Sequence, residues 1–239
     1  MLNNLDLTKI LFLDIETVPQ VGSYAELPEE TAALWNDKAS KLSRDESTGE
    51  EMYERAGIYA EFGKIICISV GFFVLREGGK REFRMRSFYG DDEALLLREF
   101  SDLLNNHYAS PTQLLCAHNG KEFDFPYIAR RLVINRLPVP AILNSVGKKP
   151  WEVQHLDTME MWKFGDWKSY TSLKLLTHVL DIPTPKTDID GSDVARVYYE
   201  EKDLDRIERY CKRDTLAVAQ VLLRYRGEEI LTEEQIVET

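Results

Sequence analysis

Cysteine and long apolar runs are both scarce in this chain of 239 residues. The three cysteines, Cys67, Cys116 and Cys211, are odd in number, far apart and mostly in apolar surroundings. This usage is typical of reduced core thiols, not of a disulfide framework, and it predicts a cytoplasmic protein. No apolar run approaches the roughly 20 residues of a membrane-spanning helix. Residues 1–8 lack the basic and apolar regions of a secretory signal, so we expect no membrane association.

Positive charge is also in deficit, because 30 Lys and Arg face 41 Asp and Glu, for a net charge of −11. This balance argues against a protein that coats nucleic acid through bulk positive charge. It leaves open an enzyme that grips a few phosphates with local cations and a bound metal. Solvated surface is the simpler interpretation of each candidate cation, but several offer local charge for a single strand: Lys121, Arg130, Arg131, Arg136, Lys148 and Lys149.

The composition that is present, 44% hydrophobic and 30% charged, is that of an ordinary globular protein. The length predicts one domain over residues 1–239, with a core at about 9–226. Pro28 opens a predicted short helix that runs through Trp35. Residues 36–57 are rich in charge and are expected to form a solvated helix or a mobile excursion, with a flap over the site as the alternative. The acidic residues 227–239 are expected to form a short docked helix or a tail.

Hydrophobic patterning predicts an α/β order of elements. Strands are expected over the apolar stretch before Asp14, over 64–75, 82–89 and 113–117, and over a short stretch that ends near 157. Helices are expected over 91–106, 126–135, 170–180 and 203–226, with a short one through about 199. Three antiparallel strands then precede two parallel ones, which places the first strand at the centre of a mixed sheet.

Two acidic residues close the first predicted strand. Lys9–Thr17 reads KILFLDIET, in which an apolar run is followed by Asp14 and Glu16. Residues i and i+2 of a strand share a face, so both carboxylates aim at one spot. Like charges this close repel, and a divalent metal with oxygen ligands is the usual compensation. A surface pair, a helix cap and the aspartate nucleophile of a haloacid-dehalogenase-type phosphatase are alternatives.

Two further carboxylates lie at informative positions. Asp124, in the stretch HNGKEFDFP, precedes a predicted helix, where it is either a cap or a residue that looks towards the core. Asp214 falls within the apolar stripe of the helix predicted over 203–226, and Tyr210 lies one turn earlier on the same face. A carboxylate on a buried face needs either a basic partner or a metal.

Taken in order, the motifs LDIET, HNGKEFD and YCKRD resemble those of the DEDD exonuclease superfamily, which has a ribonuclease-H-like fold. The Tyr-x-x-x-Asp form of the last motif resembles the tyrosine branch of that superfamily. The surrounding sequence looks closest to predicted exonucleases related to the proofreading domain of family B DNA polymerases. The resemblance spans about Lys9 to Arg224. It implies an α/β fold with a mixed five-stranded sheet, three antiparallel strands and then two parallel ones, flanked by helices.

The resemblance also implies an activity. The protein would remove nucleoside 5′-monophosphates from the 3′ end of nucleic acid, with single-stranded DNA as the expected substrate. Asp14, Glu16, Asp124 and Asp214 would bind two Mg²⁺ ions, with Mn²⁺ able to substitute, and Tyr210 would orient the attacking water. Three more residues would contact the substrate by analogy with the family: Thr17 near the terminal nucleotide, Asn119 on sugar or phosphate, and Phe123 against a base or in the core.

Several alternatives remain open on the sequence. An exoribonuclease on the same fold is the nearest one, because contacts to a 2′-hydroxyl leave no motif. A phosphatase is disfavoured because Asp214 lies within a helix behind a tyrosine, and a non-catalytic nucleic-acid-binding module is disfavoured because all four carboxylates are present. The chain has no recognisable polymerase region, so the enzyme would act alone in repair or trimming or with a separate polymerase or repair partner. Asp157 is interpreted as a turn or cap residue, with support of the site as the alternative.

Overall fold

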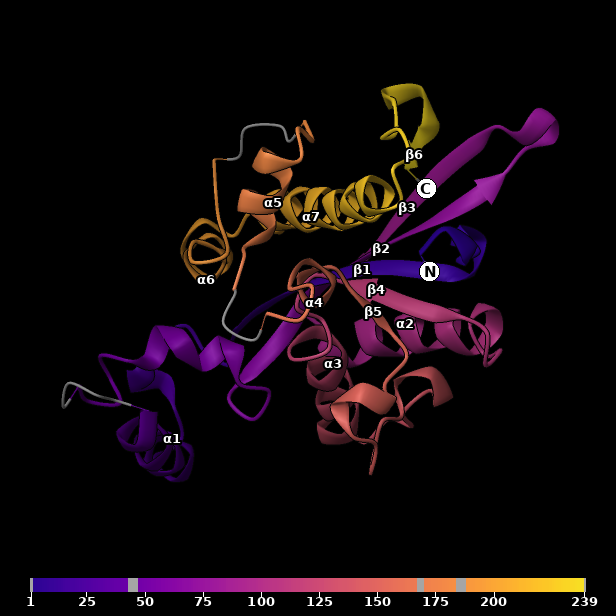
Figure 1. The fold of residues 1–239 in the computed structure, drawn as a ribbon. Coiled ribbons are helices and arrows are strands. Elements are labelled where there is room, and N and C mark those ends of the chain that lie inside the picture. Colours follow the sequence, from indigo (N-terminus) through magenta and orange to yellow (C-terminus); the bar gives the residue numbers. More distant parts are fainter. Residues whose placement is uncertain (1, 43–46, 167–169, 184–187, 239) are drawn as a thin grey trace.

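The computed structural model describes residues 2–42, 47–166, 170–183 and 188–238, and over these residues a six-stranded sheet forms the centre of the molecule (Figure 1). The order of the strands across the sheet is β5-β4-β1-β2-β3-β6. β1, β2 and β3 are antiparallel neighbours, β4 and β5 run parallel to β1, and β6 runs parallel to β3. The strands are β1 (Ile10–Pro19), β2 (Gly63–Leu75), β3 (Arg81–Tyr89), β4 (Leu114–Ala117), β5 (Leu156–Asp157) and β6 (Ile236–Glu238).

The strand order confirms the predicted arrangement, with β1 at the centre of three antiparallel and two parallel strands, but the predicted number of five strands is wrong. Ile236 pairs with Phe83 and Glu238 with Met85, so the end of the chain adds a sixth strand beside β3. The expectation of a short docked helix or a tail over 227–239 holds for the 3-10 turn at Glu233–Gln235 and is corrected for Ile236–Glu238, which form a strand. Three residues are too few to show an alternating pattern, and this strand exists because the free edge of β3 offers it hydrogen-bonding partners.

The helices cover both faces of the sheet. In Figure 1, α5 and α7 lie on one side of it, and α2 and α3 lie on the other. Side-chain caps define the starts of α2, α5 and α7, where Asp92, Ser172 and Asp203 accept hydrogen bonds from backbone N–H groups in the first turn. The helices are α1 (Glu29–Leu42), α2 (Glu93–His107), α3 (Asp124–Ile134), α4 (Thr158–Trp162), α5 (Leu173–Val179), α6 (Val194–Arg196) and α7 (Leu204–Tyr225).

β1 is buried on both faces, as its continuous apolar run predicts. Leu11 and Leu13 point to the side covered by α2 and α3, whereas Phe12 points to the side covered by α7. Opposite Phe12, Gly71 leaves room for the ring of Phe83, which a β-carbon on Gly71 would approach to 2.2 Å. Each large side chain that is fully buried in this way stabilises the fold by about 1.5–3 kcal/mol, and together they hold β1 in a fixed register.

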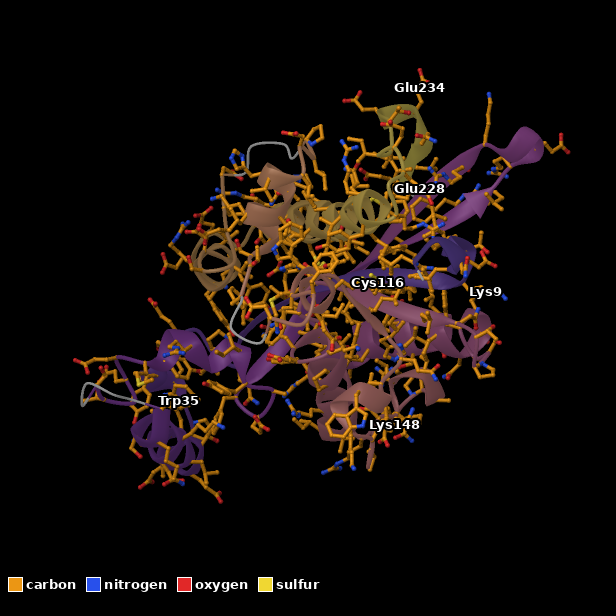
Figure 2. All side chains as sticks on the ribbon, viewed as in Figure 1. Lys9, Trp35, Cys116, Lys148, Glu228 and Glu234 are labelled. Carbon is orange, nitrogen blue, oxygen red and sulfur yellow. The ribbon has the colours of Figure 1, made fainter. Side chains whose placement is uncertain are left out.

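The expectation of a solvated helix or a mobile excursion over 36–57 is confirmed in part: residues 36–42 continue α1 with mostly exposed side chains, whereas Met52, Tyr53 and Ala56 are buried. α1 continues to Leu42, well beyond the predicted end at Trp35. Trp35 is fully buried in a small separate cluster with Met52 and Tyr53, and its indole N–H donates to the Gly49 carbonyl at 2.6 Å. Figure 2 shows Trp35 in this unit, away from the main sheet. The sequence hides the cluster because its aromatic members come from turns and helices with no common period.

Arg131 is likewise not a surface cation. Its guanidinium is buried and forms a two-pronged ion pair with Glu93, at 2.8 and 2.5 Å, and it also donates to the Ala60 carbonyl at 2.8 Å. Glu93 accepts a further hydrogen bond from the backbone N–H of Ile65 at 2.7 Å. The pair therefore joins α2, α3 and β2, and burial of Arg131 follows from its partner, which lies 38 positions earlier in the chain.

The three cysteines are buried free thiols, as predicted, and Cys116 lies within the sheet (Figure 2). Within the ranges that the structure describes, no helix has the length and apolar character needed to cross a membrane.

Candidate active site

The carboxylates of Asp14 and Glu16 lie together on the face of β1 that α7 covers. Their strand partners are Ser69 and Cys67 of β2, which share the same face of the sheet. The pairing shifts by one residue between Glu16 and Thr17, so the strand is irregular immediately after the acidic pair. Carboxylate oxygens of Asp14 and Glu16 and the sulfur of Cys211 lie within 4.8 Å of one another. The strand alternation that predicted a shared face is thus confirmed.

α7 brings Tyr210 and Asp214 to the same place. The thiol of Cys211 donates to the backbone carbonyl of Asp14 at 3.3 Å, and the hydroxyl of Thr215 donates to the carbonyl of Ser69 at 3.3 Å. These contacts fix the rotation and height of the helix above β1 and β2. The next residues along its face are then held over Asp14. Cys211 was expected only as a core thiol, and its place beside Tyr210 in YCKRD carried no further signal.

Asp214 has two neighbours on its own helix. The Tyr210 hydroxyl donates a hydrogen bond to its carboxylate, and Arg213 lies 3.6 Å from it, with its guanidinium over the Tyr210 ring at 4.8 Å from the ring centre. A separation of 3.6 Å is longer than a direct hydrogen bond. Arg213 therefore attracts Asp214 without closing it off, and the side chain of Asp214 keeps a quarter of its surface exposed.

Asp124 is the first residue of α3, and the interpretation of this residue as a helix cap is wrong. Phe123 occupies the capping position and makes no side-chain capping bond. Pairing of β1 with β4 stops at Phe12, and beyond that point the carboxylate of Asp124 accepts a hydrogen bond from the backbone N–H of Ile15. Asp124 is 3% exposed. A buried carboxylate from a helix start thereby reaches the same end of β1 as Asp14 and Glu16.

Electrostatic repulsion links Asp14 and Glu16 to Asp124 and Asp214, which are not part of the 4.8 Å group. Burial raises the pKa of Asp14 well above its ordinary value, and the negative charges of Asp124 and Asp214 raise it further. Burial also raises the pKa of Glu16 strongly, with added repulsion from Asp14 and Asp214. The pKa of Asp124 rises to about 7, mainly through burial. Asp14 and Glu16, repelled by each other and by the two further acids, constitute a site for positive charge.

The phenol of Tyr210 stays protonated in this environment. Burial is the main reason that its pKa is raised, and the neighbouring charges of Asp214, Glu16 and Asp14 act in the same direction. A deprotonated phenolate would add a negative charge to the acidic cluster. Tyr210 is therefore a neutral hydrogen-bond donor at the edge of the carboxylates.

The turn before α3 presents Asn119 in an unusual state. Its backbone is left-handed, with φ at 63°, and its buried side-chain Oδ1 finds no hydrogen-bond partner among the residues that the structure describes. Gly120 follows, where a β-carbon would lie 2.4 Å from that of Ala117. The close packing of this turn thus depends on glycine, and it leaves one amide oxygen unsatisfied.

Asp157 holds that turn in place. Its carboxylate accepts hydrogen bonds from the backbone N–H groups of Asn119 at 3.0 Å and Lys121 at 3.1 Å. It also caps α4, with bonds from Met159 at 3.0 Å and Glu160 at 3.2 Å. The predicted cap role is confirmed, and the same side chain supports the segment that leads to Asp124.

Thr17 and Phe123 both meet Tyr127, although they lie far apart in the sequence. The Thr17 side chain forms a hydrogen bond with the Tyr127 hydroxyl, which itself donates to the Gly57 carbonyl at 2.7 Å. The Phe123 ring is half-buried against the core, with its centre 5.2 Å from that of Tyr127. Each of the eight residues singled out on the sequence therefore lies on β1, the turn before α3, the start of α3, or α7.

The fold and site define a class of α/β protein with a carboxylate cluster at the end of the central strand. A family model described as "Predicted 3'-5' exonuclease related to the exonuclease domain of PolB" matches residues 58–238. The chain belongs to this family. The matched range includes Asp124, Tyr210 and Asp214, and it begins after Asp14 and Glu16.

Among solved structures, the chain is similar to the family B DNA polymerase of the hyperthermophilic archaeon Pyrobaculum calidifontis, with 16% sequence identity and a TM-score of 0.46. The likeness covers 90% of this chain and 24% of the polymerase chain. A comparison with curated proteins found no match.

Proposed function

We propose that the protein is a metal-dependent 3′–5′ exonuclease that releases nucleoside 5′-monophosphates from single-stranded DNA. The observation that carries the proposal is the convergence of Asp14, Glu16, Asp124 and Asp214 on one end of β1, with Tyr210 beside them. Membership in a family of predicted exonucleases supports the same reaction and favours it over the phosphatase alternative. A DNA substrate goes beyond that membership and is part of the proposal.

The residues fit a pair of divalent cations. The four side chains offer carboxylate oxygens, which are the ligands preferred by Mg²⁺ and Mn²⁺. Their burial and mutual repulsion raise the pKa of Asp14 and Glu16, a cost that bound cations would offset. At such sites two cations supply charge stabilisation for the attacking and leaving oxygens of phosphodiester hydrolysis. We assign Asp14, Glu16, Asp124 and Asp214 as the residues that would hold them, with Mg²⁺ as the expected ion.

Tyr210 is assigned to positioning. As a neutral phenol that already donates to Asp214, it can donate instead to the attacking water or to an oxygen of the scissile phosphate. Because its raised pKa keeps the phenol protonated, no phenolate is available to accept a proton, so Tyr210 orients and stabilises and does not act as a base. In this proposal Asp214 both receives that hydrogen bond and completes the acidic cluster.

Three residues are proposed to bind the substrate. The unsatisfied Oδ1 of Asn119 is an acceptor that a nucleotide hydroxyl or amino group would complete. The half-buried ring of Phe123 offers one edge to a base while it packs on the core. Thr17, tied to Tyr127, follows the acidic pair directly and lies where the terminal nucleotide would meet β1.

The test uses DNA and RNA oligonucleotides of one sequence, single-stranded and labelled at the 5′ end, with Mg²⁺, Mn²⁺ or EDTA. Wild type, Asp14→Ala and Asp205→Ala are compared, because Asp205 is an exposed aspartate on α7 that serves as a matched control. We expect a metal-dependent ladder that shortens from the 3′ end in wild type and Asp205→Ala but not in Asp14→Ala. Faster shortening of DNA than RNA supports the proposed substrate, and the reverse favours the exoribonuclease. Intact DNA and RNA with folded wild-type protein would refute the exonuclease.

A further inference from the structure

A pocket of about 280 Å³ lies beside the turn that carries Asn119. Three lysines from separate segments line it: Lys121 from the turn, Lys148 from the loop before β5, and Lys163 from the end of α4. Figure 2 shows Lys148 on the segment next to α3. The volume lies just below the range for ligand pockets, which begins at about 300 Å³, so the pocket can hold only a small part of a ligand.

Two of the three lysines have no ion-pair partner among the residues that the structure describes. Lys121 is paired with Glu160 at 2.6 Å, and the Asp157 carboxylate in the wall is taken up by backbone N–H groups. In the part of the chain that the structure describes, Lys148 and Lys163 form no ion pair, and Glu122 is the remaining acid in the lining. The lining holds three lysines and three carboxylates, and within this balance the two lysines without a carboxylate partner are the groups available to an anionic ligand.

An exposed aromatic residue follows one of the lining lysines in the chain. Phe164 follows Lys163, and its residue is 88% exposed. It sits in a left-handed backbone conformation, with φ at 43°, next to Gly165 at 90°. The Phe164 ring makes an edge contact with Trp162, at 6.5 Å between ring centres. Both the exposure of a phenyl ring and the left-handed backbone are unfavourable, and a ring held out in this way is a platform on which a base can stack.

We infer that the pocket and Phe164 bind the single-stranded polynucleotide that leads to the scissile 3′ end. Lys148 and Lys163 contact backbone phosphates, and the Phe164 ring stacks on a base. The inference rests on the proposed function, because the turn that forms one wall of the pocket continues directly into Asp124. Regularly spaced phosphates together with bases match a surface that combines unpaired lysines with an aromatic ring. DNA and RNA share this chemistry.

The experiment measures equilibrium binding of fluorescent single-stranded DNA and RNA of one sequence, in EDTA and over a series of salt concentrations. The variants are the double substitution Lys148→Glu with Lys163→Glu, and Phe164→Ala. Lys80→Glu is the control, an exposed lysine at the β2–β3 connection, at the far end of β2 from Glu16. For the double variant we expect affinity to fall at least about tenfold and the salt slope to drop by roughly 0.7 for each lysine. Phe164→Ala should lose about tenfold with the slope unchanged.

The control separates a built site from general surface charge. Lys80→Glu should bind like wild type, and an equal loss in Lys80→Glu and the double variant would overturn the inference. Unchanged binding by both the double variant and Phe164→Ala would also overturn it. If glutamate unfolds the protein, the Lys148→Gln and Lys163→Gln pair replaces it with the same expected change in slope. Comparison of the affinities for DNA and RNA shows which of the two nucleic acids the surface prefers.

Failure of the inference differs from failure of the proposed function. Metal-dependent shortening by wild type, lost in Asp14→Ala, together with unaltered binding by the pocket variants, would remove the inference and keep the exonuclease. Binding that depends on Lys148, Lys163 and Phe164, without any shortening by folded wild type, would remove the exonuclease and leave a single-strand-binding surface.

Discussion

Three different local arrangements position the four acidic residues of the candidate active site. Asp14 and Glu16 share a strand face, Asp124 begins a helix and takes the Ile15 N–H, and Asp214 sits one turn after Tyr210. Substitutions at these positions therefore differ in what they remove. An amide at Asp124 retains the acceptor for Ile15, whereas loss of the Tyr210 hydroxyl leaves Arg213 as the neighbouring donor to Asp214 on the same helix.

Tyr210→Phe should lower the rate of 3′ shortening by about 10²-fold or less while the binding of Mg²⁺ stays intact. The physical reason is that the hydroxyl positions the reacting groups and the carboxylates alone hold the cations. Even a donor aimed directly at the developing charge is worth on the order of 10² in rate, so a donor that orients water should cost no more than that. Single-turnover kinetics with a labelled oligonucleotide give the rate, and the Mg²⁺ dependence of thermal unfolding gives metal binding. An unchanged rate would remove Tyr210 from the reaction.

Asp124→Asn should stabilise the metal-free protein, and increasingly so as the pH rises. Because the pKa of Asp124 is raised from 3.8 to about 7 in the folded state, the folded protein keeps this proton over an interval in which the unfolded chain has lost it. The contribution of Asp124 to stability is therefore fully present below pH 3.8 and falls as the pH rises to about 7. Each pKa unit corresponds to about 1.4 kcal/mol, so the difference reaches on the order of a few kcal/mol.

Urea unfolding in EDTA at several pH values between about 4 and 8 checks this prediction. The free energy of unfolding of Asp124→Asn minus that of wild type should grow up to about pH 7 and then level off. A constant difference, or one that shrinks with rising pH, would mean that the Asp124 carboxyl does not hold a proton in the folded metal-free protein.

At the scale of elements, the buried pair of Glu93 and Arg131 fastens α2 to α3 and to β2. α3 carries Asp124 at its first residue, so this pair also sets the height of a candidate metal ligand. Arg131→Met should lower the free energy of unfolding by about 3–5 kcal/mol, because the Glu93 carboxylate would remain buried without its cation. Arg130→Met is the matched control, since Arg130 is exposed and directly precedes Arg131 on the same helix.

Urea unfolding of the two variants beside wild type gives the comparison. We expect Arg130→Met to stay within about 0.5 kcal/mol of wild type, as surface substitutions usually do. Equal stability of Arg131→Met and Arg130→Met would show that the three elements are held by apolar packing alone, without a contribution from the ion pair.

At the scale of the whole molecule, folding gathers acidic residues into a chain that already carries a net charge of −11. Mg²⁺ that binds the folded state should therefore raise the melting temperature. At a Mg²⁺ concentration of 100 times the Kd, the free energy of unfolding should increase by about 2.7 kcal/mol. The gain should be larger at about pH 8 than at about pH 6, because Asp124 must lose its proton before it can ligate a cation.

Calorimetry with and without Mg²⁺ measures this gain, with Asp14→Asn and the exposed Asp205→Asn as a matched pair. The shift should be lost in Asp14→Asn and retained in Asp205→Asn. A Mg²⁺ shift of the same size in both variants would place ion binding elsewhere on the surface.

Features that depend on short-range periodicity could be predicted from the sequence. Alternation along β1 predicted that Asp14 and Glu16 share a face, and the spacing of apolar residues predicted helices over 91–106 and 203–226, where α2 and α7 lie. The stripe that carries Tyr210 and Asp214 is likewise a property of one helix. Each of these features involves residues a few positions apart, so elementary backbone geometry determines them.

Tertiary structure alone decided the features that rest on distant partners. Whether Asp124 is a cap or a buried acid depends on the Ile15 N–H that β4 leaves unpaired, and whether Arg131 is surface or core depends on Glu93. Trp35 is buried by residues up to Ala56, and the last strand forms against β3 from across the chain. Burial depends on which distant segments pack together in the folded chain. The sequence by itself determined which side chains form this site and which face of a strand or helix each one occupies, and only the tertiary structure decided what surrounds them.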